Sequence, residues 1–221
     1  MEFSGPQPAD LVDVESLNRA FLACLRSKQA GASLRQKLPV AHHAALRRLT
    51  DLQIDRLAGA PFLLFSLREQ DTAYWKQIFA NEPGGDLFAT PPAVDDPGAR
   101  IVTAALGYIW QLARSNPYST RLVCGASIHW CEQLAASPLV TLLQRCAERS
   151  DLLEPRLAAD SRFWNRLLGP GLSPQDDVRR AAKLCALQTL LTGSATAAYT
   201  PARAAACRTA TPARQLAAGR E

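Results

Sequence analysis

Long apolar runs are missing from this sequence, and the absence bears on where the protein works. The longest runs, such as residues 60–65, are far shorter than the roughly 20 residues that a membrane-spanning helix needs. The first residues also lack the basic and apolar segments of a secretion signal. We therefore expect a cytoplasmic protein with no membrane partner.

Residues that carry catalysis are also scarce. The only three histidines, His42, His43 and His129, leave few members for a hydrolytic triad. The sequence has no phosphate-binding loop and no dinucleotide glycine pattern, and residues 125–127 lack the second glycine of a nucleophile elbow. These absences predict that the protein is not an enzyme and has no cofactor. A small-molecule enzyme built from the C-terminal helices stays as a remote alternative.

No CxxC pair occurs among the six cysteines, which are scattered along the chain. This scatter favours buried thiols over a disulfide framework. Cys124, His129 and Cys131 invite a metal hypothesis. On one helix, however, Cys124 and Cys131 would lie about 10.5 Å apart along the axis, too far for one zinc ion. The sequence therefore predicts no metal site.

Acidic residues are absent between Ser16 and Thr50, where seven lysines and arginines occur. Cations in such a run can contact phosphates, so we name a candidate nucleic-acid surface at Arg26, Arg35, Arg47 and Arg48. The alternative is that these side chains form a solvated helix face or pair with the acidic segment at residues 81–98. Both interpretations stay open on the sequence alone.

Composition divides the chain into four parts. Residues 81–98 contain four prolines and three glycines, which forbid a regular helix and indicate an acidic linker or long loop. After Thr192 the chain is rich in Ala, Thr, Arg and Pro, so we expect a largely disordered tail over 193–221. What remains is an N-terminal helical module at 10–80 and a C-terminal helical bundle at 99–192.

Apolar spacing of three and four residues predicts an all-α fold. It predicts a first helix that contains Leu11 to Leu25, with Asp10 as its cap. Pro39 suits the first turn of a second helix, and Thr50 suits the cap of a third.

In the C-terminal bundle, three pairs of a capping residue and a proline predict further helix starts. The pairs are Asn116-Pro117, Ser137-Pro138 and Ser173-Pro174, and they predict helices near 117–135, 138–149 and 174–192, the last ending at Gly193. Apolar spacing adds a helix at about 99–114 and a short helix around Phe163.

The apolar segment from Phe62 to Leu67 has no clear period. It fits either a buried helical turn or a short strand. A short helical unit next to such a segment has difficulty covering its own apolar surface, and exposed apolar patches mark interfaces. We therefore name Phe62, Leu63 and Phe65 as candidate partner-binding residues and expect a homodimer or hetero-oligomer.

One stretch of the N-terminal module matches a known pattern. Leu49-Thr50, Gln53-Ile54 and Arg56-Leu57-Ala58, followed by Leu63-Leu64 and Arg68, resemble the flagellar transcriptional regulator FlhD. The likeness covers residues 14–70 and includes Leu17-Asn18 and Phe21-Leu22. It implies a helical protein that dimerises and pairs with FlhC to activate flagellar promoters. Phe65 stands where the family has the cysteine that links its subunits, so a covalent dimer is not implied.

These features together give two hypotheses of function. The first is a bacterial transcriptional regulator or co-regulator in flagellar or motility control. It would act through a protein partner, either a second copy or an FlhC-like subunit, and DNA is a further candidate partner. The alternative is a helical adaptor or assembly protein with no role at nucleic acids.

Overall fold

The computed structural model describes residues 5–80, 96–146 and 149–198. Within these ranges the chain is built almost entirely of helices, which confirms the all-α prediction. The α-helices are α1 Pro8–Arg26, α2 Ala32–Gln36, α3 Val40–Arg47, α4 Asp51–Ala58, α5 Thr72–Ala80, α6 Pro97–Ser115, α7 Pro117–Cys124, α8 Ile128–Ala136, α9 Leu139–Cys146, α10 Ser161–Leu168 and α11 Asp176–Ala198. Two 3-10 turns, η1 Ser150–Leu152 and η2 Pro170–Leu172, and two short strands, β1 Phe65–Ser66 and β2 Glu154–Pro155, complete the described chain. None of the described helices is both long and apolar enough to cross a membrane.

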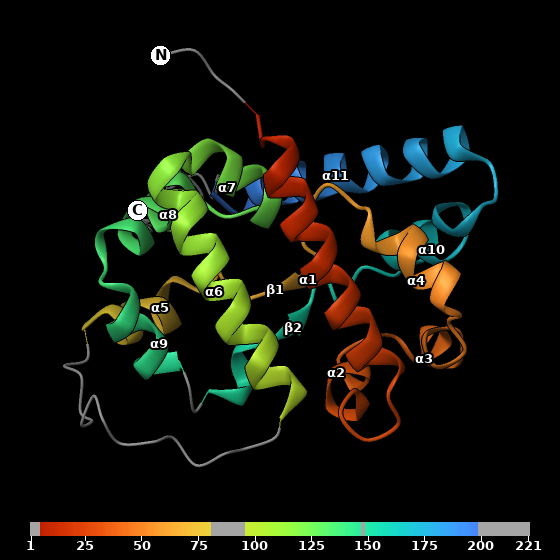
Figure 1. Cartoon of the computed structure of the whole chain (residues 1–221), viewed down its shortest axis with the longest axis horizontal. Coiled ribbons are helices and arrows are strands. Elements are labelled where there is room, and N and C mark those ends of the chain that lie inside the picture. Colours follow the sequence, from red (N-terminus) through yellow and green to blue (C-terminus); the bar gives the residue numbers. More distant parts are fainter. Residues whose placement is uncertain (1–4, 81–95, 147–148, 199–221) are drawn as a thin grey trace, which may run out of the picture.

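Segments on the two sides of residues 81–95 share one hydrophobic core. Helices α1 and α6 pack side by side and run in opposite directions (Figure 1), and the Tyr108 hydroxyl donates to the carbonyl of Asp10 at 3.0 Å. Strand β1 pairs with β2 in antiparallel register, Phe65 opposite Pro155. Buried side chains from both segments form a single cluster. The predicted parts 10–80 and 99–192 thus surround a common core.

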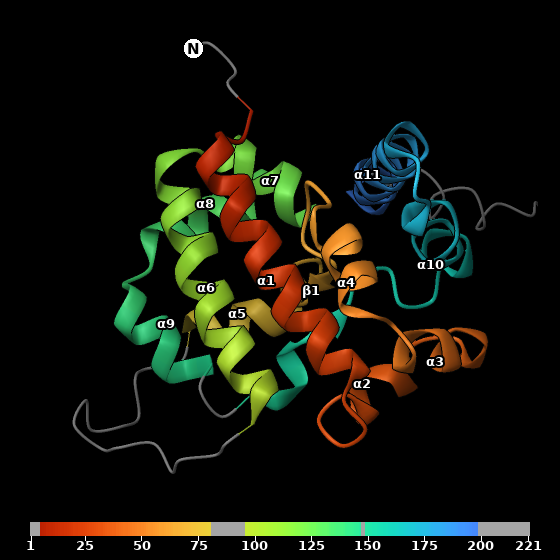
Figure 2. The same ribbon diagram turned by 45° about the vertical axis from the view of Figure 1, so that its right-hand side comes forward.

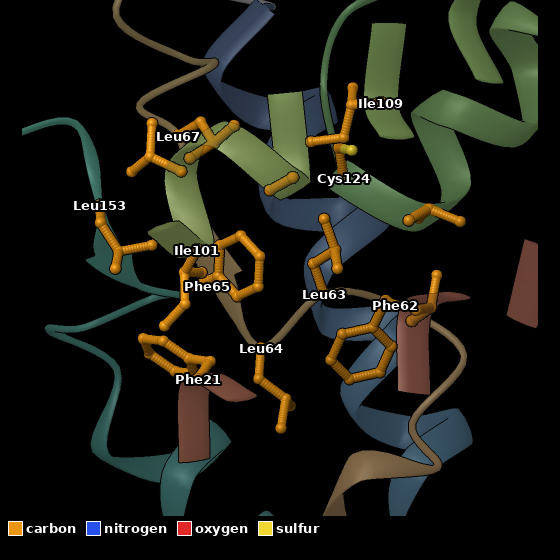
Figure 3. Close-up of a cluster of buried hydrophobic side chains, with 14 of the residues drawn as sticks. Phe21, Phe62, Leu63, Leu64, Phe65, Leu67, Ile101, Ile109, Cys124 and Leu153 are labelled. Carbon is orange, nitrogen blue, oxygen red and sulfur yellow. The ribbon is translucent and has the colours of Figure 1, made fainter. Parts of the chain in front are cut away.

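The apolar segment from Phe62 to Leu67 runs through the middle of this core, and only Phe65–Ser66 within it forms strand β1. Phe62, Leu63, Leu64 and Phe65 are all completely buried, and Figure 3 shows them among side chains from distant parts of the sequence. Phe65 packs against Phe21 with ring centroids 5.2 Å apart. Extended backbone in a helical core leaves peptide groups without helical partners, so other groups must satisfy them.

Asn18 supplies part of that hydrogen bonding. Its side chain is fully buried on α1. The Nδ2 group donates to the carbonyls of Ala58 at 3.1 Å and Phe62 at 2.9 Å, and Oδ1 accepts from the N–H of Leu64 at 2.8 Å. One amide therefore fixes the extended segment against α1.

A buried ion pair holds the other side of the same segment. The Arg156 guanidinium pairs with the Glu69 carboxylate, and both side chains are almost inaccessible. Arg156 Nε also donates to the carbonyl of Leu63 at 3.1 Å, and an Nη1 group donates to that of Cys124 at 2.6 Å. Glu69 in turn accepts from the N–H of Leu67 at 2.8 Å. Burial lowers the pKa of Arg156, and the carboxylate and carbonyls around it offset that loss of hydration.

Most helix starts lie where the sequence placed them. Thr50 caps α4 by a reciprocal pair of bonds, its Oγ1 accepting from Gln53 N–H at 3.2 Å while Gln53 Oε1 accepts from Thr50 N–H at 3.0 Å. Asn116 caps α7 through the N–H of Ser119. The prediction for Asp10 is wrong, because α1 begins earlier and Asp10 lies inside its first turn, accepting from the N–H of Gln7 at 2.7 Å.

Three predicted boundaries also need correction. The helix expected at 117–135 is two helices, because Gly125 adopts a left-handed conformation (φ 67°) and Ser127 caps a new helix. Helix α11 continues past Gly193 to Ala198, so the first residues of the expected tail are helical, while 199–221 lie outside the described residues. Helix α6 begins at Pro97, inside the expected linker, and residues 81–95 also lie outside the described ranges.

Gly125 offers a test of this break. A Cβ atom there would lie 2.6 Å from Cδ1 of Leu190 on a residue with positive φ. We expect Gly125→Ala to lower the free energy of unfolding by about 1–3 kcal/mol, measured by urea denaturation. Gly107→Ala is the matched control, because a Cβ there meets no atom within 4 Å in the interior of α6. That variant should instead gain about 0.5–1 kcal/mol, and equal losses in both would contradict the account.

Candidate functional site

The turn between α3 and α4 places two arginines on the surface. Leu46 and Leu49 are buried on either side of it, and the two residues between them, Arg47 and Arg48, are exposed. Thr50 then fixes the start of α4. Because the two buried leucines anchor the turn to the core, the side chains of Arg47 and Arg48 project into solvent.

Exposed apolar side chains accompany these arginines. Val40, Ala44 and Arg47 follow the four- and three-residue spacing of one helix face, and Val40 is 80% exposed. Leu52, in the first turn of α4, is 60% exposed. We name these five residues, Val40, Ala44, Arg47, Arg48 and Leu52, the α3–α4 corner. In the described parts of the chain, neither Arg47 nor Arg48 forms an ion pair.

The other two predicted nucleic-acid arginines have different environments. Arg35 is only 6% exposed, and its guanidinium donates to the carbonyls of Leu25, Ser27 and Lys28, where it closes the C-terminal end of α1. The structure therefore corrects the prediction for Arg35, because its donors are used inside the protein. Arg26 pairs with Asp51 at 2.6 Å and also donates to the Leu49 carbonyl at 3.3 Å. The four arginines do not form one free surface.

The prediction of a partner surface at Phe62, Leu63 and Phe65 is wrong for this structure. All three side chains have no exposed surface and pack inside the chain's own core. The chain itself covers these residues, and the side chains of Asn18 and Arg156 hold the segment in the core by donating to the carbonyls of Phe62 and Leu63. An interface must use other residues.

Hollows also lie elsewhere on the surface of the described residues. A mainly apolar hollow of about 400 Å³ lies between α1 and α6, where Leu17, Ala20, Cys24, Ile101 and Ala104 contribute to its walls. Burial raises the pKa of the Cys24 thiol, so it is protonated at neutral pH and weakly reactive. A smaller hollow of about 280 Å³ lies between the end of α4 and α11 and has a basic lining.

The remaining thiols bear on the metal question. Cys124, Cys131 and Cys146 are buried, and burial raises the pKa of Cys131 to about 12 and that of Cys146 to about 11. Cys185 is exposed, which corrects the expectation that the thiols are buried, and Cys207 lies outside the described residues. Among the described residues no group of three His, Cys, Asp or Glu side chains is arranged to hold a metal ion.

Comparisons with known proteins returned no matching protein-family model, no matching curated protein and no matching solved structure. The likeness of residues 14–70 to FlhD therefore rests on the residues themselves.

Sequence reasoning missed two surface cations on α11, Arg180 and Lys183, which border the smaller hollow. Their spacing of three residues on a helix was a usable signal, because it places them on one face. Gly59, which faces Lys183, comes from a distant part of the chain and could not be assigned from spacing.

Proposed function

We propose that this chain is a regulatory protein that acts by binding an acidic protein partner through the α3–α4 corner. One observation carries the proposal: two exposed arginines at the turn between α3 and α4 adjoin exposed apolar side chains on α3 and in the first turn of α4. Arginine is enriched at protein interfaces, and the buried centre of an interface is more apolar than the rest of the protein surface. A partner with an apolar centre and carboxylates at its rim would complement this surface.

The surroundings of the corner favour a protein over duplex DNA. Asp51 and Asp55 on the exposed side of α4 pair with Arg26 and Arg19 of α1, so these two arginines are not available for phosphates. Val40 and Leu52 gain stability from an apolar partner surface and gain little from a phosphate backbone. Charges at the rim of such an interface speed association and select the partner.

The wider role follows from the likeness to FlhD. A regulator of that kind works as part of a protein complex, and the α3–α4 corner leads directly into the matched stretch from Leu49 to Arg68. We therefore propose transcriptional control, in a flagellar or motility setting, as the process in which the partner acts. The adaptor hypothesis shares the same contact surface and differs only in that process.

Charge reversal at the corner tests the proposal. A protein that co-purifies with the native chain is made separately, and its affinity is measured by calorimetry for wild type and for Arg47→Glu/Arg48→Glu. We expect the double variant to bind about 10- to 100-fold more weakly, because two favourable charge contacts become repulsive. Helix content should not change, since Glu and Arg have similar helix propensities.

The control reverses two cations on other helices, Lys76→Glu/Arg121→Glu, and should bind as wild type does. Equal losses in both double variants would indicate a general charge effect and contradict the corner as the site. Retention of wild type on duplex DNA at moderate salt, lost only in Arg47→Glu/Arg48→Glu, would replace the protein partner with nucleic acid.

A further inference from the structure

A basic pocket is lined by residues of α11 and by Gly59 and Pro61, which follow α4. Figure 2 labels both helices. Lys183 reaches from α11 toward Gly59, and its Nζ lies 3.1 Å from the position that a Cβ atom at residue 59 would occupy. Arg180 is exposed on the same lining. Within the described chain, neither Lys183 nor Arg180 forms an ion pair. The absence of a side chain at residue 59 leaves room for the ammonium group.

The other charged groups around the pocket are already partnered. The Arg179 guanidinium donates to the carbonyls of Ser173 and Pro174, each at 2.8 Å, and pairs with Asp176. Glu15 on α1 is the remaining carboxylate whose field reaches Lys183, and it bonds to Arg19 at 2.9 Å. Lys183 and Arg180 therefore leave a net positive charge in the pocket.

The ammonium of Lys183 is also poorly hydrated. Burial lowers its pKa below the usual lysine value, and the nearby Arg179 lowers it further. The folded chain thus holds a half-buried cation at some loss of stability, and a bound anion would offset that loss.

We propose that this pocket binds the phosphate group of a small phosphorylated ligand, held by Lys183 and Arg180. Lysine acts as a point charge and arginine as a fork of donors, and both recur at phosphate sites. The volume of about 280 Å³ lies just below the usual range of small-molecule pockets, so it suits one phosphate group better than a whole nucleotide. Pro61 and Leu184 border the pocket and give the rest of the ligand an apolar contact.

Thermal unfolding of the full chain tests the site, with inorganic phosphate as the probe and sodium chloride holding the ionic strength constant. Wild type should show a saturable rise in Tm, about 3–6 °C at ten times Kd. Lys183→Met should remove that rise and should have a higher Tm than wild type without phosphate, since it removes the poorly hydrated cation. The higher basal Tm would also show that the variant folds.

Arg47→Gln/Arg48→Gln serves as the control and should respond to phosphate as wild type does. This control separates the pocket from the α3–α4 corner, so either proposal can fail without the other. A Lys183→Met response equal to wild type, or a wild-type response that chloride reproduces, would overturn the site. Stabilisation by duplex DNA well above that by phosphate, and dependent on Lys183, would overturn its assignment to a small ligand.

Discussion

Replacing Glu69 by Gln is expected to lower the free energy of unfolding by about 3–5 kcal/mol. The substitution keeps the shape of the side chain and removes its charge, which leaves the buried Arg156 guanidinium without a counter-ion. Since small domains have a total stability of about 5–15 kcal/mol, this loss is a large fraction of the whole. Urea denaturation followed by circular dichroism measures it.

Glu154→Gln is the matched control for this experiment. Glu154 bonds to Lys37 at 2.9 Å, but both side chains are partly exposed, so its loss should stay below about 1 kcal/mol. Replacing both Glu69 and Arg156 by Met should not restore wild-type stability, because the carbonyls of Leu63 and Cys124 would lose their donor. A stable Glu69→Gln variant would show that the pair does not hold the extended segment in place.

The second large effect is expected at Asn18. Asn18→Leu preserves the approximate size of the side chain but leaves the Leu64 N–H and the carbonyls of Ala58 and Phe62 buried without these partners. We expect a loss of about 3–5 kcal/mol, from a penalty of roughly 1–3 kcal/mol for each unsatisfied group and partial relaxation of the segment. Calorimetric and urea unfolding both measure the change.

Hydrogen exchange gives this prediction a local readout. The Leu64 amide should exchange slowly in wild type and much faster in Asn18→Leu under conditions where both remain folded. Asn165→Leu, at an exposed position on α10, is the control and should stay within about 0.5 kcal/mol of wild type. Unchanged protection of Leu64 in Asn18→Leu would contradict the assigned role of this amide.

Local signals in the sequence predicted much of the helical framework. The caps at Thr50 and Asn116 bond to residues only three positions later, so the local sequence is enough to predict where these helices start. The break at Gly125 is also local, yet the sequence interpretation joined two helices across it. An apolar stripe continues through such a position, and a left-handed glycine is recognised only when its conformation is known.

The burial of the segment from Phe62 to Leu67 depends on residues that are distant in the sequence. Asn18 lies 46 residues before Leu64, and Arg156 lies 93 residues after Leu63, so no local pattern connects them. This apolar segment is therefore part of the core, because polar side chains from α1 and from the turn after β2 satisfy part of its backbone hydrogen bonding.

The candidate sites also combine features that local sequence predicts with features that depend on the tertiary fold. The sequence gives the same positive charge at each of the four candidate arginines, Arg26, Arg35, Arg47 and Arg48. Only Arg47 and Arg48 project from a turn anchored by buried leucines. Arg35 closes a helix end ten residues earlier in the chain, a role that depends on how the loop folds back. The pocket at Lys183 needs Gly59, which only the tertiary fold brings beside it.

Hydrogen exchange of the full chain, with and without its co-purified protein partner, tests the central claim most directly. We predict that protection on binding is concentrated in residues 40–52, the segment that contains the α3–α4 corner, and that it disappears in Arg47→Glu/Arg48→Glu at the same concentrations. Protection confined to other elements, with residues 40–52 unchanged, would contradict the α3–α4 corner as the contact surface.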